Sequence, residues 1–247
     1  MRPGDVRTVM WKELRELGDM LTGGSRAQVV VFGLVGLFFG VISPLRQGAG
    51  WLANGTAALS YAFIGMVLLM QPMADTFAGE RERHTLETLL STRLDDSSIL
   101  LGKLFGVLAP VWAGTTLVYV VAIVATNVQF GHGRLLLPPL WTAAMTLAAI
   151  VLIPGLMAAI GVNASLHANT VRKAAQMLSL FVMALVFLPL IVTQVLPRAW
   201  AERLLALLAG RSPAEAVLAV GAGLLVLDVA IVAVALARFR RGRLLLD

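Results

Sequence analysis

The chain has 247 residues, of which 58% are hydrophobic and only 14% are charged, and it carries a net charge of +6 and no cysteine. Soluble domains carry about 25% charged residues, so this composition excludes an ordinary soluble enzyme and predicts an all-α integral membrane protein. The lack of cysteine excludes disulfides and cysteine-based metal sites, and the positive charge is typical of basic residues beside membrane spans rather than of nucleic-acid binding.

Residues 1–24 are predicted to form an amphipathic connecting helix that lies along the cytoplasmic face of the membrane. In "VRTVMWKELRELGDML", apolar side chains form one stripe and charged side chains cover the rest, so the segment is too polar to span a bilayer. The stripe consists of Val6, Met10, Leu14, Leu17 and Leu21.

Residues 25–247 are predicted to form one transmembrane domain with six spans. A span needs about 20 mostly apolar residues, and six runs meet this condition. They are residues 27–45, 51–74, 99–125, 135–162, 174–196 and 214–237. Pro110 and Pro154 lie inside the third and fourth runs and predict kinks, for which packing is favoured over a gate.

The distribution of basic residues predicts the orientation. With the N-terminus inside, the cytoplasmic segments hold 15 of the 20 lysines and arginines. This asymmetry favours a multi-pass protein of the inner (plasma) membrane with both termini in the cytoplasm. The outer loops are short, and residues 198–211 in the last of them predict an amphipathic or re-entrant helix at the outer surface.

The stretch "FAGERERHTLETLLSTR", residues 77–93, is rich in charges although it lies between two apolar runs. As a helix it would pair Glu80 with His84 and Arg83 with Glu87 at i,i+4 spacing. About 24 residues separate the two runs, whereas a few would suffice for a turn. The stretch is either a solvated connector that pairs its own charges or a helix that docks on another protein, and the second interpretation is favoured.

With its flanks, this stretch resembles the loop between the second and third spans of ABC-2 type transporter permeases, the membrane subunits of bacterial ABC exporters. The family pattern is matched at residues 77–83, 85–87, 89–90 and 101–103. It is not matched at His84, where glycine is common, nor at Leu94 and Asp95, where proline often follows. The N-terminal "KELRE" is similar to the family's connecting helix, so the resemblance covers nearly the whole chain.

The resemblance implies a division of labour. Two permease chains would form the translocation pathway as a homodimer or with a related chain, while separate ATPase subunits bind ATP and Mg²⁺ beneath them, and this chain would bind no cofactor. Residues 77–93 would be the coupling helix that an ATPase receives. Its contact residues would be Phe77, Glu80, Arg81, Glu82, Arg83, His84, Leu86, Glu87, Leu89 and Leu90.

A second cytoplasmic loop, "NASLHANTVRKAAQ", is another candidate ATPase contact. Its available side chains are His167, Asn169, Arg172 and Lys173. A solvated turn with basic residues inside explains them equally well.

No Walker-type Gly-x-x-x-x-Gly-Lys-Ser/Thr sequence occurs, so the chain is not expected to hydrolyse ATP. Lys103 is predicted to reach the inner membrane surface with its long side chain. The three histidines are scattered, and neither a metal site nor an assembled catalytic constellation is predicted.

Asp228 lies ten residues before Arg238, about 15 Å into the sixth run. Such a residue is either part of a transport pathway or hydrogen-bonded to a polar side chain of a neighbouring span, and the sequence leaves both open.

The leading prediction is therefore the permease subunit of an ATP-driven exporter. The alternative is a channel-like or scaffolding membrane protein that works without an ATPase. The substrate stays open, and the direction of transport follows only from the resemblance.

Overall fold

The computed structural model describes residues 3–23, 26–85, 91–195 and 213–239, and every regular element in that part of the chain is a helix. The long helices are α1 (Pro3–Gly23), α2 (Arg26–Leu37), α4 (Thr56–Glu82), α6 (Asp96–Phe130), α7 (Leu140–His167), α8 (Val171–Val195) and α10 (Pro213–Arg238). The predicted outer segment 198–211 lies outside the described residues.

Four of these helices are long and apolar enough to cross a membrane. They are Ala57–Glu82, Asp96–Phe130, Leu140–His167 and Leu218–Arg238, and they correspond to the predicted second, third, fourth and sixth spans. The predicted fifth span is helical as α8. Pro110 and Pro154 lie inside the continuous helices α6 and α7. The prediction of a multi-pass helical membrane protein is therefore confirmed.

The first apolar run departs from a single regular helix. After α2 comes a π-helical turn (η1, Phe38–Ile42), and then the short helix α3 (Ser43–Gln47). Gly40 lies in the π-helical turn and packs against α6, where an added Cβ would stand 3.4 Å from Val121, an ordinary van der Waals contact. The predicted start of the second run at residue 51 is wrong, because Ala49–Ala53 is a 3-10 helix (η2) and α4 begins at Thr56.

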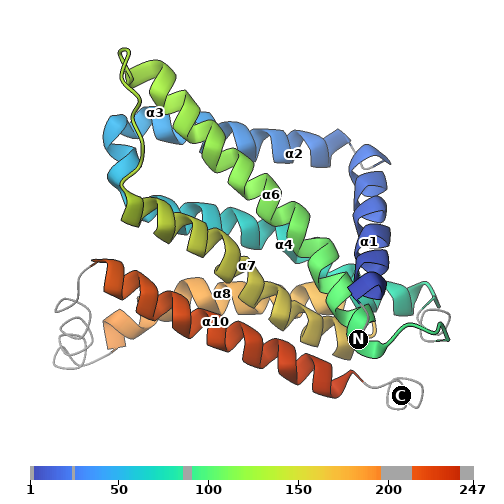
Figure 1. The fold of residues 1–247 in the computed structure, drawn as a ribbon. Coiled ribbons are helices and arrows are strands. Elements are labelled where there is room, and N and C mark those ends of the chain that lie inside the picture. Colours follow the sequence, from blue (N-terminus) through green and yellow to red (C-terminus); the bar gives the residue numbers. More distant parts are fainter. Residues whose placement is uncertain (1–2, 24–25, 86–90, 196–212, 240–247) are drawn as a thin grey trace.

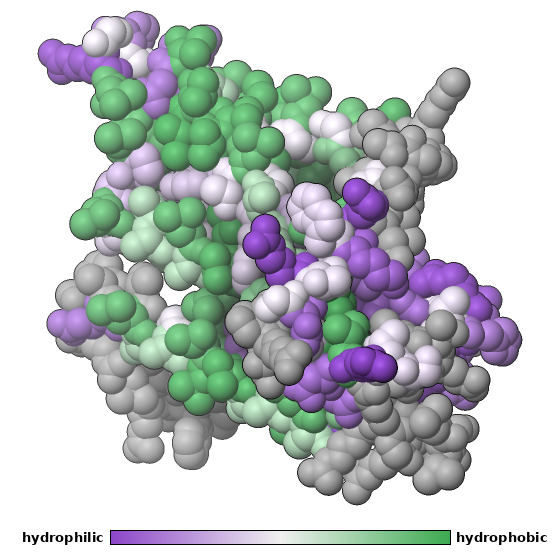
Figure 2. All heavy atoms as spheres, turned by 45° about the vertical axis from the view of Figure 1, so that its right-hand side comes forward, coloured by the Kyte–Doolittle hydropathy of each residue, from purple (hydrophilic) through white to green (hydrophobic). Residues whose placement is uncertain are grey.

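Figure 1 shows that the bundle has two ends, with α1 lying across one of them. The same end, called here the α1 end, holds the last residues of α4, α7 and α10 and the first residues of α6 and α8 (Figure 1). Figure 2 shows a large group of hydrophilic residues at this end and a smaller one at the upper left, with hydrophobic residues over much of the visible surface between them. Polar residues at the ends and apolar residues between them are what a membrane-spanning bundle requires.

The core of the bundle forms around α4 and α7, the two helices in most extensive contact. Their backbones approach closely at two glycines: an added Cβ at Gly65 would lie 2.6 Å from Pro154 Cγ, and one at Gly161 would lie 2.4 Å from Met73 Cγ. Ser165 of α7 also inserts into α4, since its hydroxyl oxygen accepts hydrogen bonds from Phe77 and Ala78 N–H. Helix α4 therefore reaches the α1 end in a position set by α7.

Helix α6 begins at Asp96 with Asp95 at the N-cap. Ser97 lies in the first turn and donates its hydroxyl hydrogen to Asp95. This hydrogen bond holds the pKa of the Asp95 carboxyl below its usual value.

Candidate functional site

Lys103 is the centre of a charged cluster at the α1 end. It lies in the second turn of α6, its exposed fraction is 1%, and its ammonium lies 5.6 Å from the centroid of the Phe77 ring. Its Nζ is 2.7 Å from Glu13 Oε1 of α1 and 3.1 Å from Glu80 Oε1 of α4. The prediction that Lys103 reaches the inner surface is wrong, because two carboxylates compensate its charge inside the protein.

Glu80 joins the same cluster from the end of α4. It is 5% exposed, accepts a hydrogen bond from the Thr85 hydroxyl, and lies 3.3 Å from the Lys12 ammonium. The charges of the two lysines and two glutamates sum to zero, and their ion pairs connect α1, α4 and α6. The predicted pairing of Glu80 with His84 is not found, since Glu80 points into this cluster.

Two glycines of α6 allow α1 to come close enough for these ion pairs. A Cβ added to Gly102 would lie 2.5 Å from Val9 Cβ, and one added to Gly106 would lie 2.6 Å from Glu13 Cβ. Among the α1 residues whose burial the structure describes, Val9 and Glu13 are buried, while Val6, Met10 and Leu14 of the predicted apolar stripe are only half-buried. Helix α1 thus packs on α6 through the face of Val9 and Glu13, which lies beside the predicted apolar stripe.

Arg81 and Glu82 link the end of α4 to the turn between α7 and α8. The Arg81 guanidinium donates to the backbone carbonyls of Ala168, at 2.9 Å, and Leu166, at 3.3 Å. Glu82 accepts a hydrogen bond from the backbone N–H of Val171, at 3.2 Å. A cation therefore satisfies carbonyls at the C-terminus of α7, and an anion satisfies an N–H at the start of α8.

The predicted single helix over residues 77–93 is wrong, because the chain leaves the helix after Glu82 and residues 91–95 are not helical. Residues up to Glu82 continue α4, and the chain then turns at His84, whose φ is 56°. This left-handed conformation is easy for glycine, which explains why glycine is common at this position of the family pattern. Arg83 folds back onto Asp75, with nitrogen–oxygen distances of 3.2 to 3.3 Å.

Several predicted contact residues remain outside the described residues or on the exposed surface. Leu86, Glu87, Leu89 and Leu90 lie outside the described residues. Glu82, Arg83 and His84 are exposed at the end of α4, whereas Phe77 is buried in the core.

The second predicted loop lies beside the first. His167, Asn169, Arg172 and Lys173 are all exposed, and the hydrogen bonds of Arg81 and Glu82 hold this loop against the end of α4. The two loops, 91 residues apart when counted from Arg81 to Arg172, therefore form one surface, called here the charged platform: Glu82, Arg83, His84, His167, Asn169, Arg172 and Lys173.

Asp228 lies away from this platform, in α10, where the helix packs on α7. An added Cβ at Gly155 would be 3.0 Å from Asp228 Oδ2, and Asp228 Oδ1 is buried with no hydrogen-bond partner in the described part of the chain. The alternative that a Ser, Thr or Tyr of a neighbouring span satisfies this oxygen finds no support in this part of the chain.

The charged cluster was not predicted from the sequence. Lys103 stands within four residues of the start of an apolar run, and Glu13 shares a helical face with Val9 and Val6. A lone cation near an apolar run and an acidic residue on a packing face are the signals that would have suggested a buried pair.

The helical bundle with apolar spans and one charged end defines the class of multi-pass membrane proteins. Residues 49–241 match the ABC-2 family transporter protein profile, which is most of the chain. The chain therefore belongs to the ABC-2 family of transporter membrane proteins, whose membrane domains are typically non-catalytic permeases that work with an ATPase. No curated protein matches the sequence.

Proposed function

We propose that this chain is the permease subunit of an ATP-binding-cassette exporter in the plasma membrane, and that it docks a separate ATPase on the charged platform. The family supports the general role. The observation that carries the specific proposal is the attachment of two distant loops to each other through Arg81 and Glu82. Exposed charges of both signs on one surface orient a docking protein.

The charged cluster supplies the mechanical connection in this proposal. Lys103 binds carboxylates from α1 and α4, and Ser165 binds the backbone of α4 from α7. A displacement of the platform by the ATPase therefore moves the ends of α1, α4, α6 and α7 together. Packed elements of this kind transmit displacements because they are not continuously deformable.

The remaining parts of the proposal follow the family and the distribution of charge. All six predicted runs cross the membrane, both termini are cytoplasmic, and α1 lies along the cytoplasmic surface. Two copies, or this chain and a related one, form the pathway, and ATP and Mg²⁺ bind to the ATPase. In support, α1 and the last residues of α10 lie at the same end of the bundle (Figure 1).

Reversing the exposed basic charges of the platform tests this docking. Arg172→Glu together with Lys173→Glu is expected to lower the amount of co-purifying ATPase by about tenfold, because each reversal replaces attraction by repulsion at the contact. The measurement is affinity purification of the tagged permease from native membranes, with the ATPase identified and quantified by mass spectrometry.

Arg134→Glu is the matched control, since Arg134 is an exposed arginine in the loop between α6 and α7, at the other end of the bundle. ATPase recovery with the double variant equal to that of the control would contradict docking on this surface. If no ATPase co-purifies with the unaltered chain either, the alternative of a channel-like or scaffolding protein is favoured.

A further inference from the structure

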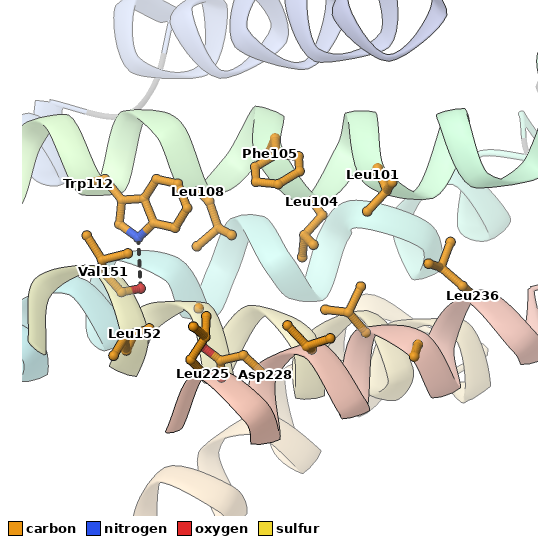
Figure 3. Close-up of a pocket in the computed structure, with 14 residues that line it drawn as sticks. Leu101, Leu104, Phe105, Leu108, Trp112, Val151, Leu152, Leu225, Asp228 and Leu236 are labelled. Carbon is orange, nitrogen blue, oxygen red and sulfur yellow. Dashed lines mark hydrogen bonds between the residues drawn. The ribbon is translucent and has the colours of Figure 1, made fainter. Parts of the chain in front are cut away.

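An apolar groove runs between α6, α7 and α10, on the side of the bundle shown in Figure 3. Its volume is about 350 Å³, which falls at the lower end of the range for ligand pockets, roughly 300–1,000 Å³. Leu104 and Leu108 from α6 and Val232 from α10 contribute aliphatic walls. This size and lining fit one hydrocarbon chain with a small headgroup.

Asp228 gives the groove a single charged position. It is the acidic residue among the described lining residues, and within this part of the chain no lysine, arginine or histidine lines the groove. Its Oδ1 is buried and has no hydrogen-bond partner there. A carboxyl group at this depth of a membrane span is costly unless a partner compensates it, and the described residues that line the groove include no cation.

Two aromatic side chains line the same groove. Phe105 and Trp112 lie on one side of α6 with their ring centroids 6.4 Å apart. The Trp112 indole N–H donates to the Val151 carbonyl of α7, at 3.2 Å, so this ring bridges the two helices (Figure 3). Aromatic faces attract ammonium groups, whereas they offer little to an anionic headgroup.

We propose that this groove binds a lipophilic amine, with the ammonium group paired to the Asp228 carboxylate and the hydrocarbon chain lying along α6 and α10. The carboxylate sets the sign of the ligand's charge, and the apolar walls set its amphipathic character. The inference stands apart from ATPase docking, because no residue of the charged platform lines the groove.

The test is a binding titration with the full-length chain in lipid nanodiscs. Pyrene-labelled dodecylamine serves as the probe, and the pyrene-labelled alcohol of the same chain length serves as its neutral counterpart. The unaltered chain is expected to prefer the amine. Asp228→Asn is expected to weaken amine binding by at least about tenfold, because it removes a charged hydrogen bond of about that value. Binding of the alcohol is expected to be unchanged, which also shows that the variant is folded.

Two further variants locate the site. Ala233 lines the groove, so Ala233→Phe is expected to abolish binding of the amine by filling it. Ala230→Phe is the matched control, because Ala230 is an exposed alanine of the same helix that does not line the groove. Asp228→Glu keeps the charge and is expected to retain the preference for the amine.

Equal affinity for amine and alcohol in the unaltered chain, together with no effect of Asp228→Asn, would overturn the proposal and leave a groove for neutral lipid chains. Loss of amine binding in Ala230→Phe to the same degree as in Ala233→Phe would also overturn it, because the contact surface would then be the outer face of α10, as expected for a second copy of the chain.

Discussion

Lys103→Met is expected to destabilise the protein by about 3–5 kcal/mol, the cost of removing one partner from a buried ion pair. The methionine fits the space of the lysine stem but leaves Glu13 and Glu80 facing each other, both less than 10% exposed. The measurement is the midpoint of thermal unfolding of the purified protein, with size-exclusion chromatography as the readout. Transport driven by the ATPase is expected to fall with it, because α1 and α4 lose their connection to α6.

A triple variant distinguishes an electrostatic cause of the lower stability of Lys103→Met from a packing defect. Adding Glu13→Gln and Glu80→Gln to Lys103→Met removes the two buried carboxylate charges that Lys103 compensated and is expected to restore most of the stability. Lys173→Met is the matched control, since Lys173 is exposed at the start of α8, and surface substitutions of this kind change stability by about 0.5 kcal/mol or less. Equal midpoints for Lys103→Met and Lys173→Met would show that the cluster does not stabilise the fold.

Gly102→Ala is expected to displace α1 from α6. The new methyl group would lie 2.5 Å from Val9 Cβ and 3.1 Å from the Val6 carbonyl oxygen, so the helix has to move outward. The cost of such overpacking is about 1–3 kcal/mol. The movement also lengthens the contact between Glu13 and Lys103, so that one added methyl group weakens the charged cluster as well.

Thiol labelling measures this displacement directly. The chain has no cysteine, so Val9→Cys introduces a single site, and Val9 is 4% exposed. Maleimide labelling of this cysteine is expected to be slow in the otherwise unaltered chain and faster after Gly102→Ala. Gly114→Ala on the same helix is the control, because an added Cβ there meets nothing within 4 Å. Unchanged labelling after Gly102→Ala would mean that α1 does not depend on this close approach.

Most of the helices could be predicted from the sequence because apolar length is a local property. The runs beginning at residues 99, 135 and 214 appear as α6, α7 and α10, with ends that differ by a few residues. The first run was less predictable, since the π-helical turn Phe38–Ile42 forms where Gly40 packs against α6. That contact involves residues about 80 positions apart, and no local pattern contains it.

The candidate site was predictable in its location and only partly in its contacts. The family pattern predicted an ATPase contact at residues 77–93, and the loop near Arg172 was a second candidate from its own residues. The structure places the end of α4 and this loop side by side. The pairing of Glu80 was predicted within one helix at i,i+4 spacing, whereas the structure pairs it with Lys103 and Lys12. A solvated i,i+4 pair is worth only a few tenths of a kcal/mol. The local prediction failed because a buried carboxylate is stabilised more strongly by two nearby cations.

By itself, the sequence determined that this is a helical membrane protein of the ABC-2 family with a charged segment after its second apolar run, because composition, apolar length and motif spacing are written along the chain. Only the tertiary structure decided which charges are buried and which are exposed. Glu80 and Arg81 are neighbours in the sequence, yet Glu80 turns into the cluster around Lys103 and Arg81 holds the turn before α8. The direction of each side chain depends on which helix end packs beside it, and this is set by close contacts such as those at Gly102 and Gly106.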